Sequence, residues 1–158
     1  MNMKKNIPII LILLAASWIS SCKSQNSESL NSNTSVNETS VVSIEHLTPK
    51  TFQSKVFDYQ KEEYAFLGEK PCIIDFYASW CGPCKVMAPT LQTVAEEYKD
   101  KINVYKVDVD DQKELAASFG ITGIPTLLFC SKNGKPQMSS GLLSKTDFDK
   151  AIQEVLLK

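Results

Sequence analysis

Apolar residues follow two different periods along the chain, and the two alternate from residue 41 to the C-terminus. Short, nearly continuous apolar runs have the length of buried strands, and they cover residues 41–44, 72–77, 102–107 and 126–130. Other stretches repeat apolar residues at the spacing of amphipathic helices, and they cover residues 49–67, 84–98, 110–119 and 144–156. Strands that alternate with helices predict an α/β fold, in which helices cover both faces of a sheet.

Capping residues indicate where the helices begin and end. Thr48, with a proline directly after it, predicts the start of the first helix. We expect this helix to continue as far as Leu67, where Gly68 ends it. Asp110 or Asp111 is expected to cap the short third helix.

Two further signals lie near the C-terminus. The sequence Lys-Asn-Gly-Lys at residues 132–135 favours a hairpin turn into a last strand near Met138. Ser144 and Asp147 have the spacing of a capping box, which predicts a closing helix after them.

The first residues of the chain have the composition of an export signal. Lys4 and Lys5 precede an apolar stretch at 7–19, which is too short for a comfortable membrane span. Ile19-Ser20-Ser21-Cys22 then resembles the bacterial lipobox, in which the cysteine receives a diacylglycerol and the leader is removed. We therefore expect residues 1–21 to be a lipoprotein signal peptide. A soluble secretory signal with an incidental cysteine and an uncleaved anchor are the alternatives, and each of them takes the domain out of the cytoplasm.

A polar stretch separates this leader from the alternating pattern. Residues 23–40 are mostly Ser, Asn, Thr, Gln and Glu, so ordering them would cost entropy without burying a core. We expect residues 22–40 to be an acylated cysteine and a flexible tether, about 20–25 Å long on average. Residues 41–158 are then the one folded domain, which we expect to be monomeric.

Net charge excludes one class of partner. The formal charge is −1, and it becomes −3 without Lys4 and Lys5, with no basic stripe along any predicted element. Nucleic acid is therefore not an expected partner.

The most informative motif is the pair of cysteines in Trp80-Cys81-Gly82-Pro83-Cys84, where a buried strand turns into a helix. Two cysteines at this spacing and place predict a dithiol redox site. Cys81 would lie at the first turn of the helix, where free backbone amides and the helix dipole favour a thiolate, so we expect it to be the nucleophile and Cys84 to resolve the mixed disulfide. Gly82 and Pro83 shape the tight turn.

A structural disulfide and half of a zinc site are the alternatives for Cys81 and Cys84. Zinc would need two more ligands, and the only histidine, His46, is far from Cys81 in the sequence. We rate His46 an ordinary surface residue, and we expect neither a metal nor a cofactor.

Several motifs together resemble the thioredoxin family, in order and at family spacing, over about residues 44–157. They are the run from Asp75 to Lys85, Ala88-Pro89, Lys106, Gly123-Ile124-Pro125-Thr126 and Gly141. The resemblance implies a thioredoxin fold: a central mixed sheet of about five strands flanked by about four helices, with the active site at the end of the second strand.

Asp75 is the one charged residue in its apolar strand, and burial of a carboxylate raises its pKa. The resemblance makes Asp75 the buried acceptor of the Cys84 proton, with Lys106 modulating its charge. A hydrogen-bonded core aspartate and a solvated surface lysine are the alternative interpretations.

The resemblance also implies a shallow apolar surface that receives the substrate. Its residues are Trp80, Gly82, Pro83, Gly123, Ile124, Pro125 and Gly141. The bond between Ile124 and Pro125 would be cis, and the Ile124 backbone would pair with an extended peptide. A core aromatic is the alternative for Trp80.

Two features have no catalytic role in this interpretation. Cys72 and Cys130 would lie opposite each other on antiparallel strands, either as small buried apolar residues or as a cross-strand disulfide. The segment 58–70 is longer than the corresponding segment in short family members. It would either lengthen the first helix or contact a partner.

These features predict an enzyme, a thiol–disulfide oxidoreductase that reduces protein disulfides in the bacterial cell envelope. Expected partners are disulfide-containing exported proteins, a transmembrane thiol electron donor, and a membrane that holds the lipid on Cys22 while the domain faces the periplasm. An oxidant or isomerase, including a role in cytochrome maturation, is the second hypothesis. A non-catalytic binding module with a thioredoxin fold is the third.

Overall fold

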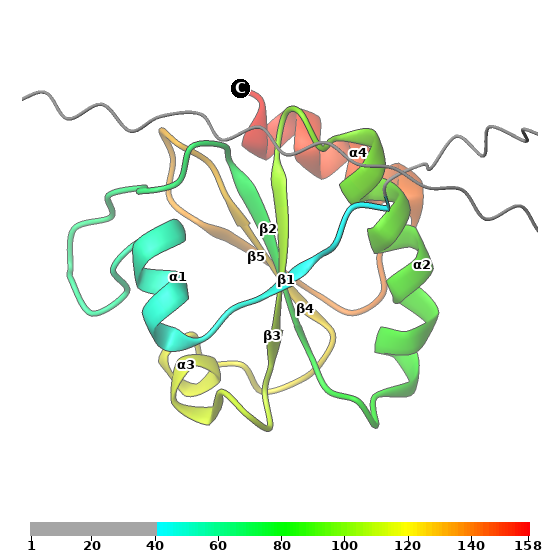
Figure 1. Cartoon of the computed structure of the whole chain (residues 1–158), viewed down its shortest axis with the longest axis horizontal. Helices are drawn as coiled ribbons and strands as arrows, with labels where there is room; N and C mark the ends of the chain where they lie inside the picture. Colours follow the sequence, from blue (N-terminus) through cyan, green and yellow to red (C-terminus); the bar gives the residue numbers. More distant parts are fainter. Residues whose placement is uncertain (1–40) are drawn as a thin grey trace, which may run out of the picture. The chain divides into compact units, whose positions relative to one another are not determined.

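The computed structural model describes residues 41–158, which form a five-stranded sheet between helices (Figure 1). The strands are β1 (Glu45–His46), β2 (Cys72–Tyr77), β3 (Asn103–Asp108), β4 (Thr126–Cys130) and β5 (Gln137–Ser140). The helices are α1 (Pro49–Lys55), α2 (Gly82–Glu97), α3 (Lys113–Ser118) and α4 (Lys145–Ala151), which continues into a π-helical turn, η1 (Ile152–Leu156). The strand order is β1-β3-β2-β4-β5. Strands β1, β3 and β2 are parallel, whereas β4 is antiparallel to both β2 and β5, so the predicted mixed sheet is confirmed.

Helices cover both faces of the sheet, with α1 and α3 on one side and α2 and α4 on the other (Figure 1). Side chains of β2 alternate between the two cores: Ile74 and Phe76 pack with Phe52 of α1, and Ile73 packs with Leu91 of α2. A strand buried on both faces must be apolar at nearly every position. This explains why the 72–77 run has no polar alternation except at Asp75.

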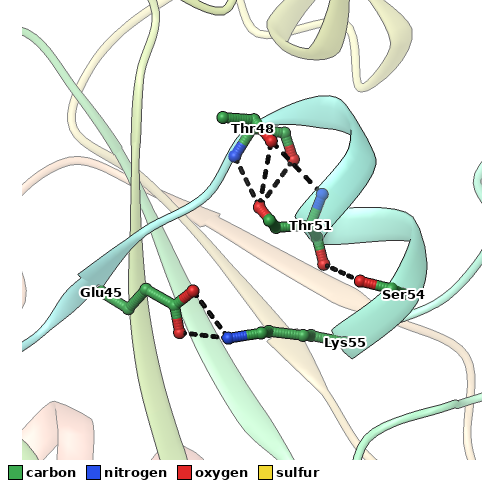
Figure 2. Close-up of polar contacts among 5 residues, drawn as sticks. All are labelled: Glu45, Thr48, Thr51, Ser54 and Lys55. Atoms are coloured by element: carbon green, nitrogen blue, oxygen red, sulfur yellow. Dashed lines mark hydrogen bonds and ion pairs between the residues drawn. The ribbon is translucent and has the colours of Figure 1, made fainter.

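Helix α1 begins at a complete capping box (Figure 2). The Thr51 amide donates to the Thr48 hydroxyl oxygen at 3.3 Å, and the Thr48 amide donates to the Thr51 hydroxyl oxygen at 2.8 Å. One turn later, Lys55 pairs with both carboxylate oxygens of Glu45 at 2.6 Å, which ties the helix to the first residue of β1. The start predicted at Thr48 is therefore confirmed.

We expect Thr48→Ala to lower the free energy of unfolding by about 1 kcal/mol, because it leaves the Thr51 amide in the first turn without its acceptor. Ser54→Ala is the matched control, since the Ser54 hydroxyl only bonds the Thr51 carbonyl within the same helix. Urea unfolding of the two variants measures the difference. Equal stability of the two variants would contradict a stabilising role for the cap.

The predicted length of the first helix is wrong. Helix α1 ends at Lys55, and the chain makes a loop that returns to it, because the Leu67 amide donates to the Val56 carbonyl at 2.8 Å. Gly68 then lies so close to the end of α1 that a Cβ atom on residue 68 would be 2.6 Å from the Lys55 carbonyl oxygen. Gly68 is therefore required for the close approach of the returning loop, and it does not stop the helix.

Two smaller predictions also differ from the structure. The first strand lies at Glu45–His46 and not at residues 41–44, where the Val42 carbonyl accepts a hydrogen bond from the Gln92 side chain at 2.8 Å. The third helix begins at Lys113, so its N-cap is Gln112, which makes no side-chain cap bond. Neither Asp110 nor Asp111 caps the helix as predicted, and the Asp110 carboxylate is bonded to another residue, as described below. The capping box of Ser144 and the strand near Met138 are confirmed.

Candidate active site

Cys81 and Cys84 form a disulfide at the point where β2 leads into α2, with their Cα atoms 5.3 Å apart. Cys81 is the N-cap residue of α2, and the Cys84 amide donates to the Cys81 sulfur at 3.2 Å. The two side chains are 3% and 4% exposed. When the disulfide is reduced, the same amide and the positive end of the 16-residue helix face the Cys81 sulfur, so they stabilise a thiolate there.

Asp75 is a buried carboxyl group on β2, only 1% exposed, and its Oδ1 atom has no hydrogen-bond partner among residues 41–158. Burial raises the pKa of Asp75 from 3.8 to about 6, while the Lys106 ammonium, 4.0 Å from Oδ2, acts in the opposite direction. A group with this pKa exchanges protons near neutral pH. The role of Asp75 as the acceptor of the Cys84 proton stays a prediction that this burial supports.

Lys106 is held by an aromatic neighbour that the sequence analysis missed. Its ammonium lies 4.6 Å from the centre of the Tyr77 ring, a cation–π contact. The Tyr77 hydroxyl lies 3.2 Å from His46 Nδ1. In the register of the three parallel strands, His46 of β1 lies opposite Lys106 of β3, and Lys106 lies opposite Asp75 of β2. Period-two alternation places Asp75 and Tyr77 on the same face of β2, so their spacing was the signal available in the sequence.

His46 is an exposed residue, as predicted, and it is the last residue of β1. Within residues 41–158, no three His, Cys, Asp or Glu residues come together in a way that could hold a metal ion.

Trp80 lies beside the disulfide with 66% of its surface exposed, so it is not a core aromatic. Its indole N–H donates to the Asp110 carboxylate at 2.7 Å, which fixes the ring. Asp110 is the second residue that the sequence analysis missed, because it is distant in sequence and was expected to be a helix cap.

The segment before β4 lies against the cysteines. Ile124 packs on the cluster that contains Cys81 and Cys84, and the Ile124–Pro125 peptide bond is cis, as the resemblance implied. The Gly141 amide donates to the Pro125 carbonyl at 2.8 Å, with Gly141 in the left-handed region at φ 95°. Gly141 is therefore linked to the predicted substrate surface, and the roles of these residues in binding remain predictions.

Of that predicted surface, Pro125 is buried and Ile124 is half-buried, whereas the other positions are exposed. Besides Trp80, they are Gly82, Pro83, Gly123 and Gly141, all of which are exposed to solvent. Cys22, the predicted signal peptide and the predicted tether lie outside the described residues. None of the helices in residues 41–158 has the length and apolar character needed to cross a membrane.

Comparison with known proteins agrees with this geometry. The profile of the family described as Thioredoxin matches residues 43–154. The chain is 41% identical to a thioredoxin of Borreliella burgdorferi over 109 residues, which is 68% of this chain and 93% of that protein. It is also 41% identical to a thioredoxin of Alicyclobacillus acidocaldarius over 95 residues, which is 60% of this chain and 90% of that protein.

Solved structures give the same result. A crystal structure of chloroplastic thioredoxin z aligns with a TM-score of 0.60 at 26% identity, covering 72% of this chain and 95% of that one. The fold, the Cys81–Cys84 pair and the sequence relatives therefore agree. This chain belongs to the thioredoxin family of thiol–disulfide oxidoreductases.

Proposed function

We propose that this protein is a dithiol reductase of the bacterial cell envelope that reduces disulfides in exported proteins. The observation that carries the direction of the reaction is the pair Gly82 and Pro83 between the cysteines. Neither residue has an ionisable side chain, so the Cys81 thiolate would be stabilised only by the helix N-terminus and the Cys84 amide. A strong oxidant needs a more strongly stabilised reduced form than this.

In the proposed reaction, the Cys81 thiolate attacks one sulfur of a substrate disulfide and releases the other as a thiolate. Cys84 then gives its proton to Asp75, directly or through water, and attacks the Cys81 sulfur. The second substrate sulfur leaves and takes up a proton. The substrate gains two electrons, and the protein is left with the Cys81–Cys84 disulfide.

The surface around the disulfide suits an extended peptide. Trp80 and Ile124 offer apolar contact beside Cys81, and the exposed glycines leave the backbone open to a substrate strand. We propose that the Ile124 backbone pairs with the substrate there.

The proposed location rests on the N-terminal sequence. A diacylglycerol on Cys22 would anchor the chain to a membrane, and residues 22–40 would let the domain reach several exported substrates in the periplasm. Electrons would come from a thiol carrier that spans the membrane. Finding the protein fully oxidised in cells that retain all such carriers would contradict this direction of electron flow.

The reduction potential of the protein against glutathione tests the proposal directly. We expect a value of about −270 mV, which is typical of thioredoxins that act as reductants. A value well above about −180 mV would instead favour an oxidant or isomerase. If no exchange with glutathione occurs at all, the protein is a binding module and the reductase proposal is wrong.

A further inference from the structure

Two more cysteines lie opposite each other in the sheet, far from the active site. Cys72 is the first residue of β2 and Cys130 is the last of β4, and they are directly paired in the antiparallel register. Both thiols are free, and both side chains are 0% exposed. Residues paired in this way have Cα atoms about 4.5–5.5 Å apart, which is within the range that a disulfide spans.

The two side chains also lie on the same face of the sheet. Cys72 and Cys130 belong to one core cluster, on the side covered by α1 and α3. The direct pairing and the shared cluster place the two side chains next to each other. Burial, with the neighbouring Cys72 acting in the same direction, raises the pKa of the Cys130 thiol. A closed disulfide would therefore need side-chain rotation rather than strand movement.

The segment 58–70 lies over this pair. Tyr64, in the middle of the segment, donates a hydrogen bond from its hydroxyl to the carbonyl of Ser131, the residue after Cys130, at 2.7 Å. Its ring packs on Phe57 with ring centres 4.9 Å apart. Tyr64 also packs on the core cluster that contains Cys72 and Cys130. Burial, followed by the nearby Cys130 and Cys72 thiols, raises the pKa of Tyr64. Tyr64 therefore fastens the segment over the two thiols.

This pair is separate from the active site. Cys72 begins β2, whereas Cys81 lies beyond the opposite end of that strand and belongs to a different core cluster. Six residues of strand span about 20 Å, so Cys81 cannot reach the Cys72 sulfur within one molecule.

We propose that Cys72 and Cys130 are a second redox centre, which closes to a cross-strand disulfide, and that the segment 58–70 controls access to it. A second redox centre gives a role to the Cys72–Cys130 pair and to the segment 58–70, neither of which takes part in the active site. It does not depend on the direction in which Cys81 and Cys84 work.

The reaction needs an external disulfide as oxidant, such as glutathione disulfide. When the segment 58–70 opens locally, one of the two thiols loses its proton and attacks that disulfide, releasing one thiol. The other cysteine attacks the resulting mixed disulfide and releases the second thiol. Two protein thiols are oxidised to one disulfide, and one external disulfide is reduced to two thiols.

The test uses the full-length protein, purified in detergent and fully reduced. It is incubated with glutathione disulfide under native conditions, its remaining thiols are alkylated, and it is digested without reduction for mass spectrometry. We expect a peptide pair linked through Cys72 and Cys130, formed more slowly than the Cys81–Cys84 link, which reports that the oxidant works. Recovery of Cys72 and Cys130 only as alkylated thiols, or only as glutathione adducts, would overturn the proposal.

Two variants test the covering role of the segment. Tyr64→Ala removes both the ring and the hydrogen bond, so we expect the Cys72–Cys130 link to form about tenfold faster or more, with Cys81–Cys84 oxidation unchanged. Tyr64→Phe keeps the ring and should give a rate between those of the wild type and the alanine variant. Equal rates in all three proteins would show that the segment does not control access.

Discussion

Replacing Cys81 by serine is expected to lower the rate of protein disulfide reduction by about 10³-fold or more. The hydroxyl of serine has no useful anionic form at neutral pH, and no other described cysteine has its sulfur facing a helix amide. The rate is measured by following the reduction of a disulfide-bonded test protein with dithiothreitol as electron source.

Cys130→Ala is the matched control for this loss, because Cys130 is a buried cysteine away from the active site, and dithiothreitol keeps the proposed Cys72–Cys130 centre reduced during the assay. It should keep a rate close to that of the wild type. Substantial activity in the Cys81→Ser variant would mean that another group attacks the substrate.

Replacing Asp75 by asparagine is expected to stabilise the protein and slow its catalysis. The pKa of Asp75 is about 6 in the folded protein against an ordinary value of 3.8. The folded state therefore binds this proton more tightly, so the contribution of Asp75 to stability is most favourable below pH 3.8 and declines as pH rises to about 6. Above that pH the buried charge costs about 3 kcal/mol.

Asparagine carries no charge, although its buried amide finds no better partners, so we expect a net gain of about 2 kcal/mol at pH 8 that disappears below pH 4. Urea unfolding as a function of pH measures it. If Asp75 accepts the Cys84 proton, resolution of the mixed disulfide should slow by about 10- to 100-fold in this variant. Asp100→Asn, at an exposed position, should change neither quantity. A gain that is the same at pH 4 and pH 8 would contradict a raised pKa.

The fold could be predicted from the sequence wherever burial or capping decided the outcome. The continuous apolar run at 72–77 and the cap at Thr48 each had one physical interpretation, and both are confirmed. The end of α1 could not be predicted, because the loop returns through a bond between Leu67 and Val56 that no local pattern specifies. The strand expected at 41–44 failed for a similar reason, since apolar residues there pack beside α2 without pairing.

The reactive centre was easier to predict than its surroundings. The spacing of Cys81 and Cys84 and the isolated charge of Asp75 are local features, so the sequence displayed them directly. The contacts of Tyr77 with Lys106 and of Trp80 with Asp110 join distant segments, and they exist only because neighbouring strands are aligned. Alternation along β2 could have indicated Tyr77, whereas nothing in the sequence indicated the bond to Asp110.

Cys81 is expected to attack substrate disulfides, and Cys84 is expected to release the reduced substrates. The most direct measurement uses the Cys84→Ser variant, which is mixed with disulfide-bonded proteins, quenched by alkylation and analysed by mass spectrometry without reduction. If Cys81 attacks and Cys84 resolves, substrates accumulate as mixed disulfides joined through Cys81. If no mixed disulfide forms, or if substrates are joined through a different cysteine, this assignment of the two residues is wrong.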